Sequence, residues 1–150
     1  MLRSSRRWWI GGIIVIFIIG FITWQGVREE ALPTTASFGT AVVVKDPPVQ
    51  VRTGVPVQFA WEVRAPIGSI AISTAIHWGP TSIATVNDQT TPDELTFAGQ
   101  IIDYAVGRFA LPRTFTGAVV FASPGTYYYR AHALIDEKNI WSPEYEVVVE

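Results

Sequence analysis

The chain has 150 residues, enough for one ordinary domain and a short appendage, and 49% of them are apolar while only 16% are charged. So few charges exclude a disordered chain and indicate contact with a membrane, and a net charge of −2 gives no reason to expect a nucleic-acid partner. The lack of cysteine excludes disulfides, thiolate metal sites, cysteine nucleophiles and lipid anchors on cysteine.

Residues 8–27 form a stretch of twenty residues without a charge near the start of the chain. As a helix this stretch would be roughly 30 Å long, which matches the hydrocarbon core of a lipid bilayer. Tryptophans stand at both of its ends, as in the aromatic belt of a membrane span: Trp8 and Trp9 at one end and Trp24 at the other. The stretch therefore predicts a transmembrane helix over residues 8–27.

The charges on either side of this stretch predict its orientation. Arg6 and Arg7, with Arg3, precede it, whereas one arginine and two glutamates follow it at 28–30. Because positive charge collects on the cytoplasmic side, we expect residues 1–7 to form a cytoplasmic arm and the rest of the chain to be extracytoplasmic. The alternatives are a cleaved signal peptide, which normally has a shorter apolar stretch and a small-residue cleavage site, and a twin-arginine export signal.

Residues 28–36 combine charges with a proline and small polar residues, a composition typical of a linker. Nine residues reach at most about 30 Å when fully extended. The domain that follows, residues 37–150, should therefore stay close to the outer surface of the membrane.

Residues 37–150 show the period-two alternation of β-strands, bounded by proline and glycine. Strands are expected at 41–44, 55–63, 70–78, 115–121, 127–135 and 141–149, with a polar turn at 136–139. In the second and third of these, the face expected in the core comprises Val55, Val57, Phe59, Trp61, Val63, Ile70, Ile72, Thr74, Ile76 and Trp78. Because these strands are joined by tight turns and no amphipathic helices stand between them, the sequence predicts an all-β, two-layer antiparallel sandwich.

The stretch 79–112 has no regular pattern, and the sequence assigns no strands to it with any consistency. Thr91 followed by Pro92 is typical of the start of a helix. The adjacent carboxylates Asp93 and Glu94 are expected to be solvated turn residues.

The run Thr126–Ala133 (TYYYRAHA), a polar turn and then Trp141–Glu144 (WSPE) resemble the last two strands of a fibronectin type III domain. Trp61 stands where that family has its second-strand tryptophan. The resemblance implies an immunoglobulin-like sandwich in which Tyr127 is the tyrosine-corner residue that hydrogen-bonds back to the preceding connection. It covers the middle of the chain poorly, where extra loops or an extra strand are expected, and it implies no catalytic residues.

The sequence contains no recognisable catalytic or nucleotide-binding motif and has only two histidines, His77 and His132. In an immunoglobulin-like sandwich their strands are neighbours in one sheet, so both side chains should lie on the same outward face. Two imidazoles lack the third protein ligand that a metal site normally has, so neither a metal nor a cofactor is expected.

That outward face should carry small and aromatic residues and one arginine, without lysine or carboxylate, a composition typical of protein interfaces. We therefore predict an interaction surface formed by Ser73, Ala75, His77, Tyr128, Arg130 and His132. A shift of one residue in the strand register would instead turn these side chains inward.

Together these features favour a non-catalytic, single-pass membrane protein whose extracytoplasmic sandwich is a binding or structural module. Its expected partners are the lipid bilayer and other membrane proteins, as for an accessory subunit of a larger complex. The alternative is a surface adhesion or ligand-binding protein. A tethered enzyme or metal-binding protein that uses the His77/His132 face is a less favoured third hypothesis.

Overall fold

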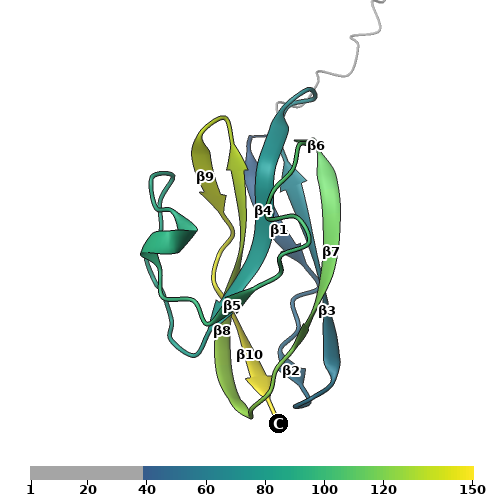
Figure 1. Cartoon of the computed structure of the whole chain (residues 1–150), viewed down its shortest axis with the longest axis vertical. Coiled ribbons are helices and arrows are strands. Elements are labelled where there is room, and N and C mark those ends of the chain that lie inside the picture. The colour runs from purple at the N-terminus through teal and green to yellow at the C-terminus, as the bar shows by residue number, and fades with distance from the viewer. Residues whose placement is uncertain (1–38) are drawn as a thin grey trace, which may run out of the picture. The chain divides into compact units, whose positions relative to one another are not determined.

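The computed structural model describes residues 39–150, which form a two-layer β-sandwich (Figure 1). The expected cytoplasmic arm, the transmembrane helix and the whole linker over 28–36 lie outside the described residues. The same holds for Trp8, Trp9 and Trp24 in the expected helix and for Arg6 and Arg7 before it. From residue 39 onward, no helix has the length and apolar character needed to cross a membrane.

The smaller sheet has three strands in the order β1-β3-β7, all antiparallel. Their bounds are Ala41–Lys45, Pro56–Arg64 and Arg113–Val120. Alternation of buried and exposed residues along β3 and β7 places one face of this sheet in the core, as the period-two pattern predicts.

The larger sheet has the order β2-β10-β8-β4-β5, with β6 paired to β4 and β9 paired to β8. The bounds are β2 Gln50–Val51, β4 Ile70–Gly79, β5 Gly99–Gln100, β6 Phe109–Ala110, β8 Gly125–Ile135, β9 Lys138–Trp141 and β10 Tyr145–Val149. All of its pairs are antiparallel except β2 with β10. The prediction of an all-β antiparallel sandwich is confirmed.

The core between the sheets is built on aromatic residues that the alternation placed there. Trp61 is fully buried and stacks on Phe115, with ring centroids 5.8 Å apart. The ring of Phe59 in β3 packs edge-on against that of Tyr129 in β8, with centroids 5.0 Å apart, and this contact joins the two sheets.

The tyrosine corner implied by the fibronectin resemblance is present. The hydroxyl of Tyr127 donates a 3.2 Å hydrogen bond to the carbonyl oxygen of Ser123, four residues upstream in the turn before β8.

Two residues expected in the core are exposed. Val55 precedes the first residue of β3 and is 50% exposed. Ile72 is 44% exposed because β4 carries a bulge between Ala71 and Ser73: the single extra residue turns Ile72 outward and buries Ala71 completely.

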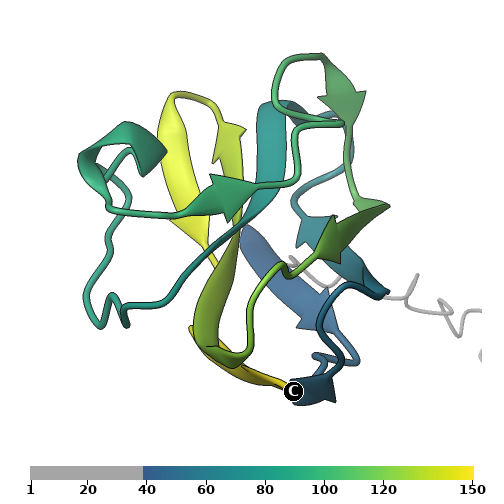
Figure 2. The same cartoon turned by 60° about the horizontal axis from the view of Figure 1, so that its bottom comes forward.

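The irregular stretch between β4 and β7 has two parts. Residues 99–110 run back along the edge of β4 through β5 and β6, with irregular hydrogen bonds such as Thr74 N–H to the Tyr104 carbonyl at 2.9 Å. Residues 80–98, here called the cover segment, leave β4 and make an excursion beside the larger sheet (Figures 1 and 2). The excursion contains a 3-10 helix, η1, over Pro92–Glu94.

Candidate binding site

His77 and His132 lie on neighbouring strands of the larger sheet, with their ring centroids 5.7 Å apart. The β4–β8 register pairs Ala75 with His132 and His77 with Arg130, so the two imidazoles are diagonal neighbours on one face. The prediction that this face brings the two histidines together is confirmed. The prediction that they face solvent is wrong, because His77 is only 4% exposed and His132 only 3%.

Two parts of the chain cause this burial. In β9, Trp141 lies against His132 with ring centroids 4.4 Å apart, and the cover segment folds back over the outer face of β4, β8 and β9. The backbone N–H of Asn139 donates to the Asp88 carbonyl, and the indole N–H of Trp141 donates to the Thr90 carbonyl, both at 3.0 Å. Phe97 lies against His77 with ring centroids 5.0 Å apart and stacks on Trp141 at 6.0 Å. The sheet register is as expected, and the chain's own middle region occupies the face.

Arg130 secures the start of the cover segment and is not a free surface residue. Arg130 is 6% exposed, and its guanidinium donates to the Ser142 carbonyl at 2.9 Å and to the Ile83 carbonyl at 2.7 Å. Its Nε lies 3.6 Å from a carboxylate oxygen of Glu144, and that carboxylate accepts hydrogen bonds from the Ile83 N–H and the Ser82 hydroxyl. Arg130 and Glu144 therefore hold residues 82–84 from both sides.

The other members of the expected interaction surface differ in exposure. Ala75 is buried, whereas Ser73 and Tyr128 remain half-buried. The surface as first expected is therefore not exposed, because four of its six residues are buried beneath or beside the cover segment.

Both histidines are neutral at physiological pH because of this burial. Loss of solvation, together with the neighbouring His132, lowers the pKa of His77 to about 3. Burial also lowers the pKa of His132, and its hydrogen bond to Asn139 opposes the shift only in part. In that bond His132 Nε2 donates to Asn139 Oδ1 at 2.9 Å. His77 Nε2 is buried and has no hydrogen-bond partner among residues 39–150.

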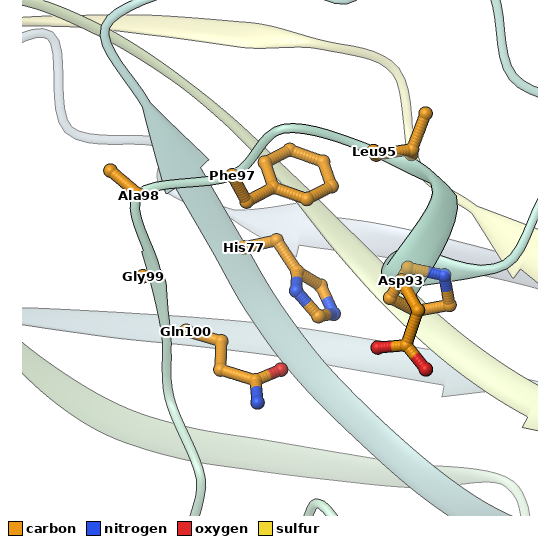
Figure 3. A pocket seen from close by; sticks show the side chains of 8 residues that line it. His77, Asp93, Leu95, Phe97, Ala98, Gly99 and Gln100 are labelled. Carbon is orange, nitrogen blue, oxygen red and sulfur yellow. The ribbon is translucent and has the colours of Figure 1, made fainter.

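Two adjoining pockets, each of about 340 Å³, open where η1 faces β5. They share four lining residues, which define what we call the η1 groove: His77, Pro92, Asp93 and Gln100. One pocket continues along Phe97 and the other continues toward Ala105 and Leu134. Figure 3 shows the His77 ring, the Asp93 carboxylate and the Gln100 carboxamide turned toward the same space.

The position of η1 follows from local chemistry that the sequence indicated. Thr91 precedes the helix, Pro92 is its first residue, and the Thr91 N–H donates to Glu94 Oε2 at 3.1 Å. Glu94 is thus occupied within the turn, whereas Asp93 makes no ion pair and no side-chain hydrogen bond within the described part of the chain. Both carboxylates are exposed, as expected for solvated turn residues, and Asp93 also lines a pocket.

The arrangement provides hydrogen-bonding and aromatic groups but no metal centre. Among residues 39–150 no three His, Cys, Asp or Glu side chains lie close enough together to hold a metal ion. The metal-binding hypothesis for the His77/His132 face therefore gains no third ligand from the described chain.

Several residues of this site could not be found by motif or alternation: Asp93, Phe97, Gln100, Asn139 and Trp141. Asn139 and Trp141 fell within the expected turn and last strand, with no indication of what they contact. The three residues between 93 and 100 belong to the stretch without a regular pattern, where the one available signal was the Thr91-Pro92 helix start.

No protein-family model matches the sequence, and no curated protein is similar to it in sequence. Among solved structures, the chain is similar to the PKD domain of an M14-like peptidase from a Thermoplasmatales archaeon, with a TM-score of 0.51 and 17% identity over 73% of this chain and 92% of that one. Fibronectin(III)-like modules of Clostridium thermocellum CbhA give a TM-score of 0.42 at 17% identity, over 73% of this chain and 45% of that one. The CARDB domain of PF1109 from Pyrococcus furiosus gives a TM-score of 0.42 at 15% identity, over 73% of this chain and 92% of that one.

Because the second and third scores lie below 0.5, the fold assignment rests on the PKD domain and on the strand order itself. At 17% identity this likeness shows the fold alone. Residues 39–150 therefore form an immunoglobulin-like β-sandwich, with a cover segment of 19 residues over the outer face of its larger sheet.

Proposed function

We propose that this chain is a single-pass membrane protein whose extracytoplasmic sandwich is a non-catalytic binding or structural module, acting as an accessory subunit of a larger membrane complex. One observation carries the proposal: twenty uncharged residues, flanked by tryptophans and preceded by arginines, stand only nine residues ahead of the sandwich domain.

The length of the linker favours a membrane partner over a distant one. A reach of at most about 30 Å keeps the sandwich at the height where neighbouring membrane proteins protrude. A surface adhesion protein would have to project further.

The chemistry of the sandwich supports a binding role. The two histidines, the residues best suited to acid–base catalysis, are buried and neutral, and the buried Arg130 is engaged in holding the cover segment. Sandwiches of the immunoglobulin, fibronectin III and PKD types commonly have binding or structural roles, although the same architecture hosts other functions.

The topology can be tested by cysteine labelling, because the natural chain has no cysteine to interfere. We expect a membrane-impermeant maleimide, applied to intact cells, to label Ser123→Cys in the exposed turn before β8 and to leave Ser4→Cys unlabelled until the membrane is permeabilised. The chain should also stay in the membrane fraction after extraction with alkaline carbonate. Labelling of Ser4→Cys in intact cells, or release by carbonate, would contradict the anchored topology.

The accessory role requires a separate experiment. Native membranes should be extracted with a mild detergent, separated by size, and examined by mass spectrometry for proteins that migrate with this chain. A fixed stoichiometry with larger membrane proteins is the expected result. Migration alone, near the mass of one chain in a micelle, would contradict the accessory role and favour the adhesion or ligand-binding alternative.

A further inference from the structure

The η1 groove has an unbalanced charge. Asp93 is the one carboxylate that lines it, and no lysine or arginine lines either of its pockets. The histidines at its floor add no positive charge, because burial keeps both neutral at physiological pH. The groove therefore presents a single uncompensated negative charge, which favours a cationic ligand.

Three polar side chains line the groove, of which His77 is buried while Asp93 and Gln100 are exposed. The Nε2 atom of His77 is unpaired within the described chain. Neither the carboxylate of Asp93 nor the carboxamide of Gln100 takes part in a side-chain hydrogen bond within residues 39–150, and Figure 3 shows both turned toward the space beside the His77 ring. The His77 nitrogen lies beneath the surface of the groove, whereas Asp93 and Gln100 are exposed. A ligand can therefore pair with these two side chains without displacing a protein partner.

Exposed apolar side chains lie next to the other end of the groove. The second pocket runs along Ala105 and Leu134. The Gly107 N–H donates to the Ile72 carbonyl at 3.0 Å, which brings the preceding residue, Val106, beside the bulge of β4. Val106 is 91% exposed and Ile72 is 44% exposed, so both can contact a partner without any change in the core.

We propose that the η1 groove binds a lysine or arginine side chain from an extended segment of a partner protein, and that an apolar residue of the same segment packs on Ile72 and Val106. Asp93 pairs with the cationic group, and the carboxamide oxygen of Gln100 accepts one of its N–H groups. The adjoining apolar contacts favour a protein segment over a free amine, which would leave Ile72 and Val106 exposed. This proposal deepens the binding role proposed above and rests on it.

The test uses the full-length protein in detergent micelles with carbon-13-labelled histidine, followed by NMR. The probe is the peptide Ac-Ile-Gly-Arg-Gly-Ile-NH2, whose isoleucines stand on both sides so that its direction in the groove does not matter. The same peptide with citrulline, the neutral isostere of arginine, is the control ligand. We expect the arginine peptide to shift the His77 ring signal saturably, with a Kd of about 1 mM, and the citrulline peptide to bind about tenfold more weakly.

The chain offers a matched pair of charge variants on the same turn. Asp93→Asn should weaken binding of the arginine peptide about tenfold, because it removes the counter-ion. Glu94→Gln removes the same charge one residue further on and retains an oxygen to accept the Thr91 N–H, so it should weaken binding less than about twofold. Val106→Ser, on an exposed side chain, should weaken binding about threefold through lost apolar contact.

Three results would overturn the proposal: equal binding of the arginine and citrulline peptides, equal weakening by Asp93→Asn and Glu94→Gln, or no shift up to about 20 mM peptide. Unchanged histidine spectra of the peptide-free variants show that the groove is intact in each. Co-migration with membrane proteins remains a separate readout. A partner that co-migrates while the peptide fails to bind overturns this site alone, whereas peptide binding by a chain that migrates alone overturns the accessory role alone.

Discussion

The indole N–H of Trp61 donates a 2.8 Å hydrogen bond to the hydroxyl oxygen of Thr74, and this bond joins the two sheets across the core. Trp61 belongs to β3 and Thr74 to β4, and both are fully buried. The Thr74 hydroxyl in turn donates to the His132 carbonyl at 2.6 Å. One small side chain therefore connects the core tryptophan to the backbone of the strand that carries the second histidine of the site.

Replacing Thr74 with valine, which has nearly the same shape, should lower the free energy of unfolding by about 2 kcal/mol, because the Trp61 N–H is left buried without an acceptor. Thr74→Ser keeps the hydroxyl and loses a methyl group, so its expected cost is smaller, about 1 kcal/mol. Urea unfolding of the two variants measures which loss is larger, that of the hydrogen bond or that of the methyl group. A larger loss in the serine variant would show that packing of the methyl group outweighs the hydrogen bond.

Stability should fall as the pH is lowered from 7 to 5, because His77 has a much lower pKa in the folded chain than in the unfolded one. Between these two pKa values the unfolded chain binds more protons than the folded chain. The contribution of neutral His77 to the free energy of unfolding is thus complete above the unfolded pKa of about 6.5. It is lost progressively as the pH falls, and the loss reaches about 2 kcal/mol at pH 5.

The variant His77→Phe tests which group is responsible. It removes the titrating ring and keeps an aromatic side chain next to Phe97 and Trp141, so stability should depend less on pH. A smaller dependence should remain, because the pKa of His132 is also lowered. Thermal unfolding across this pH range, in the natural chain and the variant, is the measurement, and identical pH profiles would exclude His77 as the cause.

Neutralising Glu144 should loosen the cover segment. Glu144→Gln leaves the buried Arg130 guanidinium without its carboxylate partner and weakens the contacts to residues 82 and 83. We expect hydrogen exchange of amides in residues 82–98 to accelerate about tenfold, with little change in the core of β3. Glu146→Gln, an exposed residue of the adjacent β10, removes the same charge and should leave exchange unchanged. Equal acceleration in both variants would point to an effect of net charge.

The turn between β8 and β9 offers a gain in stability. Its two residues, Asp136 and Glu137, both have positive φ angles, 49° and 63°, a conformation that side chains disfavour. Glu137→Gly should therefore raise the free energy of unfolding by about 1 kcal/mol, measured by urea unfolding. The same substitution at Glu146, within β10, should be destabilising because glycine weakens an extended strand. A loss of stability at position 137 would show that the Glu137 side chain makes a contribution that outweighs its backbone strain.

Much of the sandwich could be predicted from alternation, because strands that bury one face repeat their apolar residues with a period of two. Phe59, Trp61 and Val63 are in the core as expected, and Tyr127 makes its corner. The bulge at Ile72 could not be foreseen, because a single extra residue leaves no local signal and is set by pairing with β8.

The site was predictable only in part, for a different physical reason. Neighbouring strands in the expected sandwich bring His77 and His132 to one face, and this was correct. Their burial depends on contacts between the cover segment and residues about fifty positions further along, such as Trp141 with Thr90. Contacts of that range leave no periodic pattern in the sequence, so the face was expected to be open. Binding of a partner segment in the η1 groove is a prediction that the peptide titration tests.

Within residues 39–150 one strand pair is parallel, β2 with β10, and it determines how the sandwich would carry a mechanical load. The backbone hydrogen bonds that join this stretch to the last strand include Val148 N–H to the Val49 carbonyl, Glu150 N–H to the Val51 carbonyl, and Thr53 N–H to the Glu150 carbonyl. When the chain is pulled from the N-terminal side of β2 and the C-terminal end of β10, parallel strands slide in opposite directions. The force then acts along both strands and loads these bonds together in shear, whereas an antiparallel pair pulled in this way would open one bond at a time.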